Sequence, residues 1–68
     1  MMKEVTKNGI TLVFYQKQND EKYSFLIKDD EELTNRLLKS VKKQRIDEDE
    51  IGYAIKGIFA KIENNFIG

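Results

Sequence analysis

Residues 8–15, Asn-Gly-Ile-Thr-Leu-Val-Phe-Tyr, join the strongest short turn signal in the chain to a run of strand-forming residues. Asn-Gly favours a two-residue type I′ turn, because that turn requires a positive φ at both central positions. The run then alternates Ile10, Leu12 and Phe14 with Thr11, Val13 and Tyr15. Apolar and aromatic residues at period two predict a strand that begins directly after the turn.

Further strands are predicted on both sides of this run. Downstream, Tyr23, Phe25 and Ile27 alternate with Ser24, Leu26 and Lys28, and a polar turn segment, residues 17–22, separates the two runs. Upstream, the Asn-Gly turn pairs residues 3–7 with the first run. Since an isolated two-stranded hairpin is marginal in water, a three-stranded meander is the better expectation than the two-stranded alternative.

The two turns together predict a register. The first places Lys7 opposite Ile10 and Val5 opposite Leu12; the second, centred on residues 19–20, places Phe14 opposite Phe25, Leu12 opposite Ile27 and Val13 opposite Leu26. One face then collects Val5, Ile10, Leu12, Phe14, Tyr23, Phe25 and Ile27. Helices from the rest of the chain must cover that face. A slip of one residue would exchange the two faces.

A first helix is predicted over residues 31–44. The acidic run 29–32 marks its start. Carboxylates at the N-cap and in the first turn accept hydrogen bonds from the free backbone N–H groups and interact favourably with the helix dipole. Leu33, Leu37 and Val41 follow at helical spacing, with basic residues near the carboxyl end. This pattern predicts an amphipathic helix.

A second helix is predicted after Asp47. Asp47 and Glu50 have capping-box spacing, and Ile46 and Ile51 have the spacing of a hydrophobic staple. One apolar stripe follows, formed by Ile51, Ile55, Ile58, Ile62 and Phe66, flanked by Ala54 and Phe59, with fraying expected near residues 64–65. Gly52 and Gly57 lower helix propensity, and close packing of a neighbouring backbone would explain them.

The predicted fold is therefore α+β, in the order β-β-β-α-α. A hairpin or three-stranded meander precedes an αα-hairpin, whose helices are joined by about three residues, 45–47, and pack on one sheet face. The whole chain, residues 1–68, is expected to be one domain, because no linker or composition change divides it.

The residue types argue against catalysis. The chain has no His and no Cys, so the usual neutral-pH base, thiolate nucleophile and zinc ligands are absent. Ser24 and Ser40 lack a glycine-flanked elbow, and the glycines are scattered. The acidic runs 29–32 and 47–50 are interpreted as helix starts. We expect no enzyme activity, no cofactor, no metal and no small-molecule substrate.

The sequence also predicts a compartment. The first residues are polar, and no apolar run approaches the ~18 residues needed to span a bilayer. We therefore expect neither a signal peptide nor membrane association, which favours a cytoplasmic protein.

Two surfaces are candidates for protein contact. The sheet face opposite the predicted core carries Val13, Tyr15 and Leu26, and the back of the second helix carries Tyr53, Ala60 and Ile67. Spare apolar surface of this kind is typical of contact sites, although scattered exposed apolar residues are also ordinary. The leading hypothesis is a non-catalytic interaction or regulatory module that binds a protein partner or a second copy as a homodimer.

The alternative hypothesis is nucleic-acid binding. Arg36, Lys39, Lys42 and Lys43 fall on one side of the first predicted helix, where a basic stripe could contact phosphates. The ordinary interpretation is a solvated face, since cations favour a helix carboxyl end. The net charge of the chain is zero, from 12 basic and 12 acidic residues, which disfavours a general nucleic-acid binder.

Overall fold

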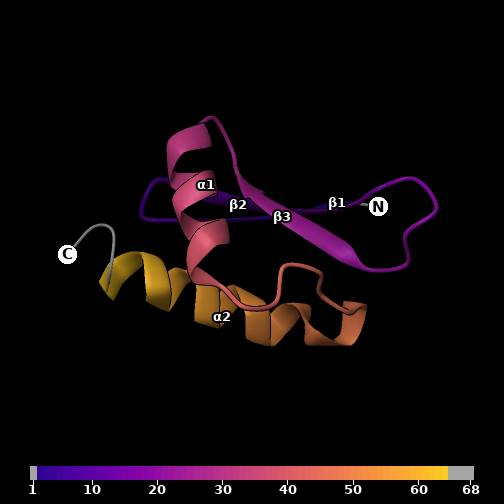
Figure 1. Ribbon diagram of the computed structural model, residues 1–68. Helices are drawn as coiled ribbons and strands as arrows, with labels where there is room; N and C mark the ends of the chain where they lie inside the picture. The colour runs from indigo at the N-terminus through magenta and orange to yellow at the C-terminus, as the bar shows by residue number, and fades with distance from the viewer. Residues whose placement is uncertain (1, 65–68) are drawn as a thin grey trace.

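A sheet and two helices make up the computed structural model, which describes residues 2–64. The sheet is antiparallel, with strand order β1-β2-β3. The elements are β1 (Met2–Lys7), β2 (Ile10–Gln16), β3 (Tyr23–Ile27), α1 (Glu31–Ser40), the 3-10 turn η1 (Glu48–Glu50) and α2 (Ile51–Ile62). Figure 1 shows how the strands and helices are arranged. Side chains from both helices join one core with the inner face of the sheet. The predicted β-β-β-α-α order is confirmed.

The first turn sets the register as predicted. Asn8 and Gly9 have φ values of 53° and 79°, as a type I′ turn requires. Lys7 pairs with Ile10, and the register carries on to the far end of β1. The second turn places Phe14 opposite Phe25 and Val13 opposite Leu26, again as predicted. Asn19, in that turn, has a φ of 63°.

The core occupies the predicted sheet face. Leu12, Phe14, Tyr23, Phe25 and Ile27 are all buried, and Val5 and Ile10 pack at the margin. The rings of Phe14 and Phe25 face each other across β2 and β3, with centroids 6.1 Å apart. This tilted pair is a favourable aromatic arrangement.

The start of α1 follows the prediction. The carboxylate of Asp30 accepts a hydrogen bond from the backbone N–H of Leu33 at 2.9 Å. The hydroxyl of Thr34 accepts from the N–H of Ile27 at 2.9 Å, so the first turn of α1 is fastened to the end of β3. Leu37 is fully buried against the sheet.

The predicted end of the first helix is wrong. It ends at Ser40, four positions before Gln44, because Val41 adopts an extended conformation with φ −99° and ψ 144°. The chain then runs to Ile46, which exchanges two backbone hydrogen bonds of 2.8 Å with Tyr23. This pairing with the edge of β3 satisfies the backbone hydrogen-bonding groups of Ile46. The connection therefore spans residues 41–47, whereas about three residues were predicted.

The start of α2 differs in detail from the predicted capping box. The Asp47 side chain makes no capping hydrogen bond. Its carboxylate instead lies 3.7 Å from the ammonium of Lys22 on the neighbouring turn. The two residues of the predicted staple, Ile46 and Ile51, are both buried in the core. This apolar pair therefore anchors the chain on both sides of η1, the 3-10 turn that precedes α2.

The apolar stripe of α2 lies on the core, as predicted. Ile51, Ile58, Phe59 and Ile62 are buried, whereas Ala54 and Ile55 are partly buried. Residues 63–64 continue as a wider π turn. The predicted Phe66 contact and fraying at Asn65 lie outside the described residues.

The two glycines of α2 contradict the packing explanation. A Cβ added at Gly52 or Gly57 would meet no atom within 4 Å. No backbone approaches either position within residues 2–64. The loss of helix propensity at the two glycines is therefore not offset by close packing inside the described fold.

The two helices meet at one point. Figure 1 shows their axes crossing steeply, with the carboxyl end of α1 directed at α2. There the ammonium of Lys61 donates to the carbonyl oxygen of Ser40 at 2.9 Å. This crossing leaves the connection 41–47 alongside α2.

Candidate functional site

The outer sheet face is hollowed in its middle. The hollow measures about 590 Å³. It is lined by Met2, Glu4, Val13, Tyr15, Gln16, Leu26 and Lys28. We call these seven residues the outer-face hollow. It gathers the three predicted contact residues of the sheet into one site.

The strands determine the shape of the outer-face hollow. Val13 is 6% exposed and forms its floor, while Tyr15 and Leu26 are half-buried beside it. Met2 is 62% exposed and pairs with Tyr15 through β1. Met2 was not among the predicted contact residues, because the first strand was predicted to begin one residue later.

The charges of the outer-face hollow balance. Glu4 projects from β1 and Lys28 follows β3, so one acid and one base stand at opposite sides of an apolar centre. A surface with this arrangement can meet a neutral or self-complementary surface without like-charge repulsion.

The predicted contact residues of α2 form no common patch with the outer face. Tyr53 is 86% exposed and Ala60 is exposed, but α2 packs against the inner face of the sheet. Ile67, the third predicted residue, lies outside the described residues. Tyr53 therefore belongs to a separate surface.

A second hollow runs beside α2. It measures about 290 Å³ and lies between α2 and the connection 41–47. Its lining residues are Phe25, Val41, Lys42, Lys43, Ile46, Ala54, Gly57, Ile58 and Lys61, which we call the α2 groove. A smaller hollow shares Lys43, Ile46 and Ala54 with it and extends to Glu50 and Tyr53. This groove was not predictable from the sequence, because most of the connection was predicted to be helical.

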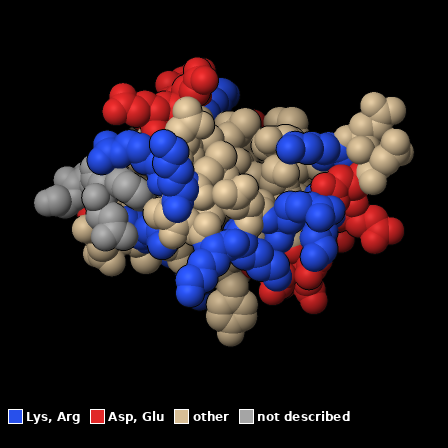
Figure 2. Space-filling model, in the orientation of Figure 1, with Lys and Arg blue, Asp and Glu red and all other residues tan. Residues whose placement is uncertain are grey.

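The four predicted phosphate contacts do not all belong to α1. Arg36 and Lys39 are on α1, whereas Lys42 and Lys43 follow its end. The prediction of one basic helix face is therefore wrong, and the early end of α1 is the reason. In Figure 2 basic side chains border an uncharged central area, and acidic side chains gather at the margins of the molecule.

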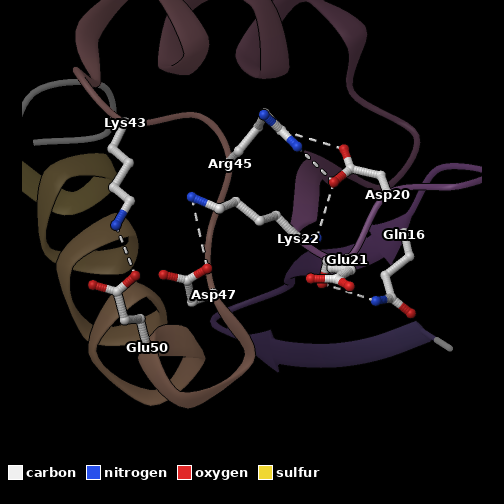
Figure 3. A network of polar contacts seen from close by, with 8 residues as sticks. All are labelled: Gln16, Asp20, Glu21, Lys22, Lys43, Arg45, Asp47 and Glu50. Atoms are coloured by element: carbon white, nitrogen blue, oxygen red, sulfur yellow. Dashed lines mark hydrogen bonds and ion pairs between the residues drawn. The ribbon is translucent and has the colours of Figure 1, made fainter.

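Lys43 is already paired with an acid. Its Nζ donates to Oε1 of Glu50 at 2.7 Å (Figure 3). This hydrogen bond raises the pKa of Lys43 and lowers the pKa of Glu50. Both side chains are about half exposed, so the pair fastens the connection to the start of α2 with modest strength.

A second polar contact ties the connection to the β2–β3 turn. Arg45 donates from Nη2 to Oδ1 of Asp20 at 2.7 Å and from Nε to Oδ2 at 3.2 Å. The backbone N–H of Lys22 also donates to this carboxylate, at 2.9 Å (Figure 3). The Arg45 hydrogen bond, followed by that from Lys22, lowers the pKa of Asp20.

We expect this ion pair to give a measurable pH dependence. A lowered pKa in the folded state adds stability above the unfolded-state pKa, and that stability is lost as the pH falls through the folded-state value. Asp20→Asn should therefore be less stable than wild type at neutral pH. The difference should shrink to nothing as the pH falls below 3.8, the ordinary pKa of the group. Urea unfolding at a series of pH values measures it, and a constant difference would contradict the assignment.

Within residues 2–64, no group of three or more acidic side chains is arranged to hold a metal ion. None of the helices described for this chain is long and apolar enough to cross a membrane. The carboxylates with shifted pKa values, Asp20 and Glu50, both face basic side chains at the surface. Their pKa shifts are therefore those of structural ion pairs at the surface.

Comparison with known proteins finds no similarity that assigns this chain: no family model, no curated protein and no solved structure matches it.

Proposed function

We propose that this chain is a non-catalytic interaction module that binds protein through the outer-face hollow. The observation that carries the proposal is the position of Val13, Tyr15 and Leu26 together, on the sheet face that neither helix covers. A contiguous apolar patch with polar margins is the usual character of a protein contact site. The half-buried Tyr15 supplies the kind of aromatic anchor that dominates binding energy.

The size of this face indicates the class of interaction. Three strands about 4.8 Å apart and five residues long, at about 3.4 Å per residue, form a face of roughly 14 by 17 Å. Stable complexes bury about 800 Å² on each partner, which is well above this area. The contact should therefore be weak and transient if it uses this face alone.

A second copy of the chain is the first partner to test. Glu4 lies on edge strand β1 and Lys28 directly follows the other edge strand, β3. A two-fold axis along the strands therefore turns the acidic side of one copy towards the basic side of the other. Such an arrangement is isologous, with the same patch used by both copies. It requires no other surface of the fold.

Charge placed in the outer-face hollow should abolish association. We expect wild type to self-associate with rising concentration in sedimentation velocity, and Tyr15→Lys and Leu26→Lys to remain monomeric at the same concentrations. A buried lysine without a partner is costly, so a reduction of at least about tenfold in affinity is expected. Circular dichroism should show that both variants keep the wild-type fold.

Thr6→Lys is the matched control. Thr6 is exposed on the same sheet face but does not line the outer-face hollow. It should associate like wild type, apart from the loss of its 2.8 Å hydrogen bond with Thr11. Self-association that Tyr15→Lys leaves unchanged would contradict this location of the contact.

Nucleic-acid binding remains the alternative proposal. Its support is the group of basic side chains Arg36, Lys39 and Lys42, which are exposed on α1 and just beyond it. The zero net charge and the pairing of Lys43 with Glu50 weaken it. Phosphate contacts release counterions, so such binding would fall steeply as salt rises.

A further inference from the structure

The α2 groove has an apolar floor. Phe25, Ile46 and Ile58 come from three different segments, β3, the connection and α2, and each is nearly buried there. Val41 and Ala54 are partly buried at its sides. A hollow of about 290 Å³ over such a floor can hold a large apolar side chain from another molecule.

Three lysines line the same groove, and no acid does. Lys42 and Lys43 stand on the connection and Lys61 stands on α2, so the positive charges lie on both walls. Apolar floor and basic walls together favour a ligand that carries carboxylates next to an apolar group.

Two of these lysines are already held in place. Lys43 is fixed by Glu50 at 2.7 Å, and Lys61 by the carbonyl oxygen of Ser40 at 2.9 Å. An ammonium group has three donors, so each retains donors for an incoming carboxylate. Lys42 makes no hydrogen bond or ion pair with residues 2–64. Lys43 and Lys61 are thus positioned before any ligand arrives, which lowers the entropic cost of binding at these two side chains.

Gly57 supplies an independent observation. It lines the α2 groove, has a helical conformation, and would place a Cβ in open space. A glycine in a helix interior is unfavourable, and nothing within the described fold offsets that cost. The absence of a side chain here keeps the groove open and lets a second backbone come close to α2.

We propose that the α2 groove binds an acidic peptide segment of another protein. The segment inserts a large apolar side chain over Ile46 and Ile58, and its carboxylates contact Lys42 and Lys61. A nucleic acid fits the site less well, because its phosphates would meet the lysines while the aliphatic floor stayed without a partner. This inference does not rest on the outer-face hollow, which lies on the opposite face of the sheet.

The test is a selection from a displayed library of random ~12-residue peptides on the purified wild-type chain. Peptides that also bind Gly57→Gln are removed by counter-selection. We expect the enriched peptides to combine Asp or Glu with Leu, Ile, Phe or Met. Fluorescence polarisation of one labelled enriched peptide then measures the affinity of each variant. Enrichment of basic or uncharged peptides, or no enrichment, would overturn the proposal.

Gly52→Gln is the matched control for Gly57→Gln. Both glycines are on α2 and both would place a side chain in open space, but Gly52 does not line the α2 groove. Both variants should have a higher unfolding midpoint than wild type, since glutamine favours a helix more than glycine does. A loss of binding therefore cannot come from unfolding.

The expected affinities separate the possible occupants. Gly57→Gln and the double variant Lys42→Glu with Lys61→Glu should bind the peptide at least about tenfold more weakly, whereas Gly52→Gln and Tyr15→Lys should bind like wild type. Equal binding by the double variant Lys42→Glu with Lys61→Glu would overturn the proposal. Binding of labelled single-stranded DNA would also overturn the proposal under three conditions. The DNA would have to bind wild type, fail to bind Gly57→Gln, and stay bound when the peptide is added.

Discussion

Phe14→Ala should lower the free energy of unfolding by about 3–5 kcal/mol, the cost of removing a buried phenylalanine from a packed core. Phe14 is 0% exposed at the middle of the central strand and packs on Phe25. A chain of this length has a total stability of roughly 3–10 kcal/mol, so the variant should be largely unfolded under mild conditions.

Tyr15→Ala is the matched control for this prediction. Tyr15 is the next residue on β2, but its side chain lies on the outer face and is half-buried. The structure predicts a clearly smaller loss, measured as the shift in urea midpoint. Equal losses for the two variants would mean that the helices do not cover the face that carries Phe14.

Leu37→Ala should lower the free energy of unfolding by about 2–5 kcal/mol. Leu37 is the buried residue of α1 and is 0% exposed, so its loss leaves a cavity between α1 and the sheet. The rest of the contact consists of Leu33 and Leu38, which are partly buried. Without Leu37, α1 should also show faster amide hydrogen exchange.

Leu38→Ala makes the same chemical change one residue away. Because Leu38 is only partly buried, it should cost clearly less than Leu37→Ala in urea unfolding. Helix propensity changes by the same amount in both variants, so their difference isolates burial. Reversed losses would contradict the orientation of α1.

Local chemistry made the sheet predictable. The Asn8-Gly9 turn fixes the pairing of β1 with β2, and alternation along β2 and β3 then decides which face is buried. The cap at Asp30 was equally local, because an acid before a helix needs only the nearby N–H group of Leu33. Each of these features depends on residues a few positions apart.

The end of α1 was not predictable in this way. Residues 41–44 have a composition that suits a helix, but Ile46 pairs with Tyr23, a residue far away in the chain. Such a tertiary contact overrides helix propensity and leaves no periodic signal. The α2 groove follows from the same contact, since it exists only because the connection is extended beside α2.

The two proposed binding sites, the outer-face hollow and the α2 groove, lie on different sides of the fold. The helices use the inner face of the sheet for the core, which leaves the apolar residues Val13, Tyr15 and Leu26 for contact outside it. On the other side, the crossing of α1 and α2 leaves the α2 groove open. A small domain with both sites could link a weakly held protein on one face to an acidic segment on the other.

Affinity capture from lysate of the cells in which the protein occurs tests the central proposal most directly. The tagged wild type, Tyr15→Lys and Thr6→Lys are compared with and without nuclease, with an untagged copy of the chain added to each. We expect wild type and Thr6→Lys to retain the same protein, either the untagged copy or a distinct partner. We expect Tyr15→Lys to lose this protein and nuclease to have no effect. If Tyr15→Lys retains every protein that wild type retains, or if nuclease abolishes the retention, the outer-face hollow is not the protein contact site.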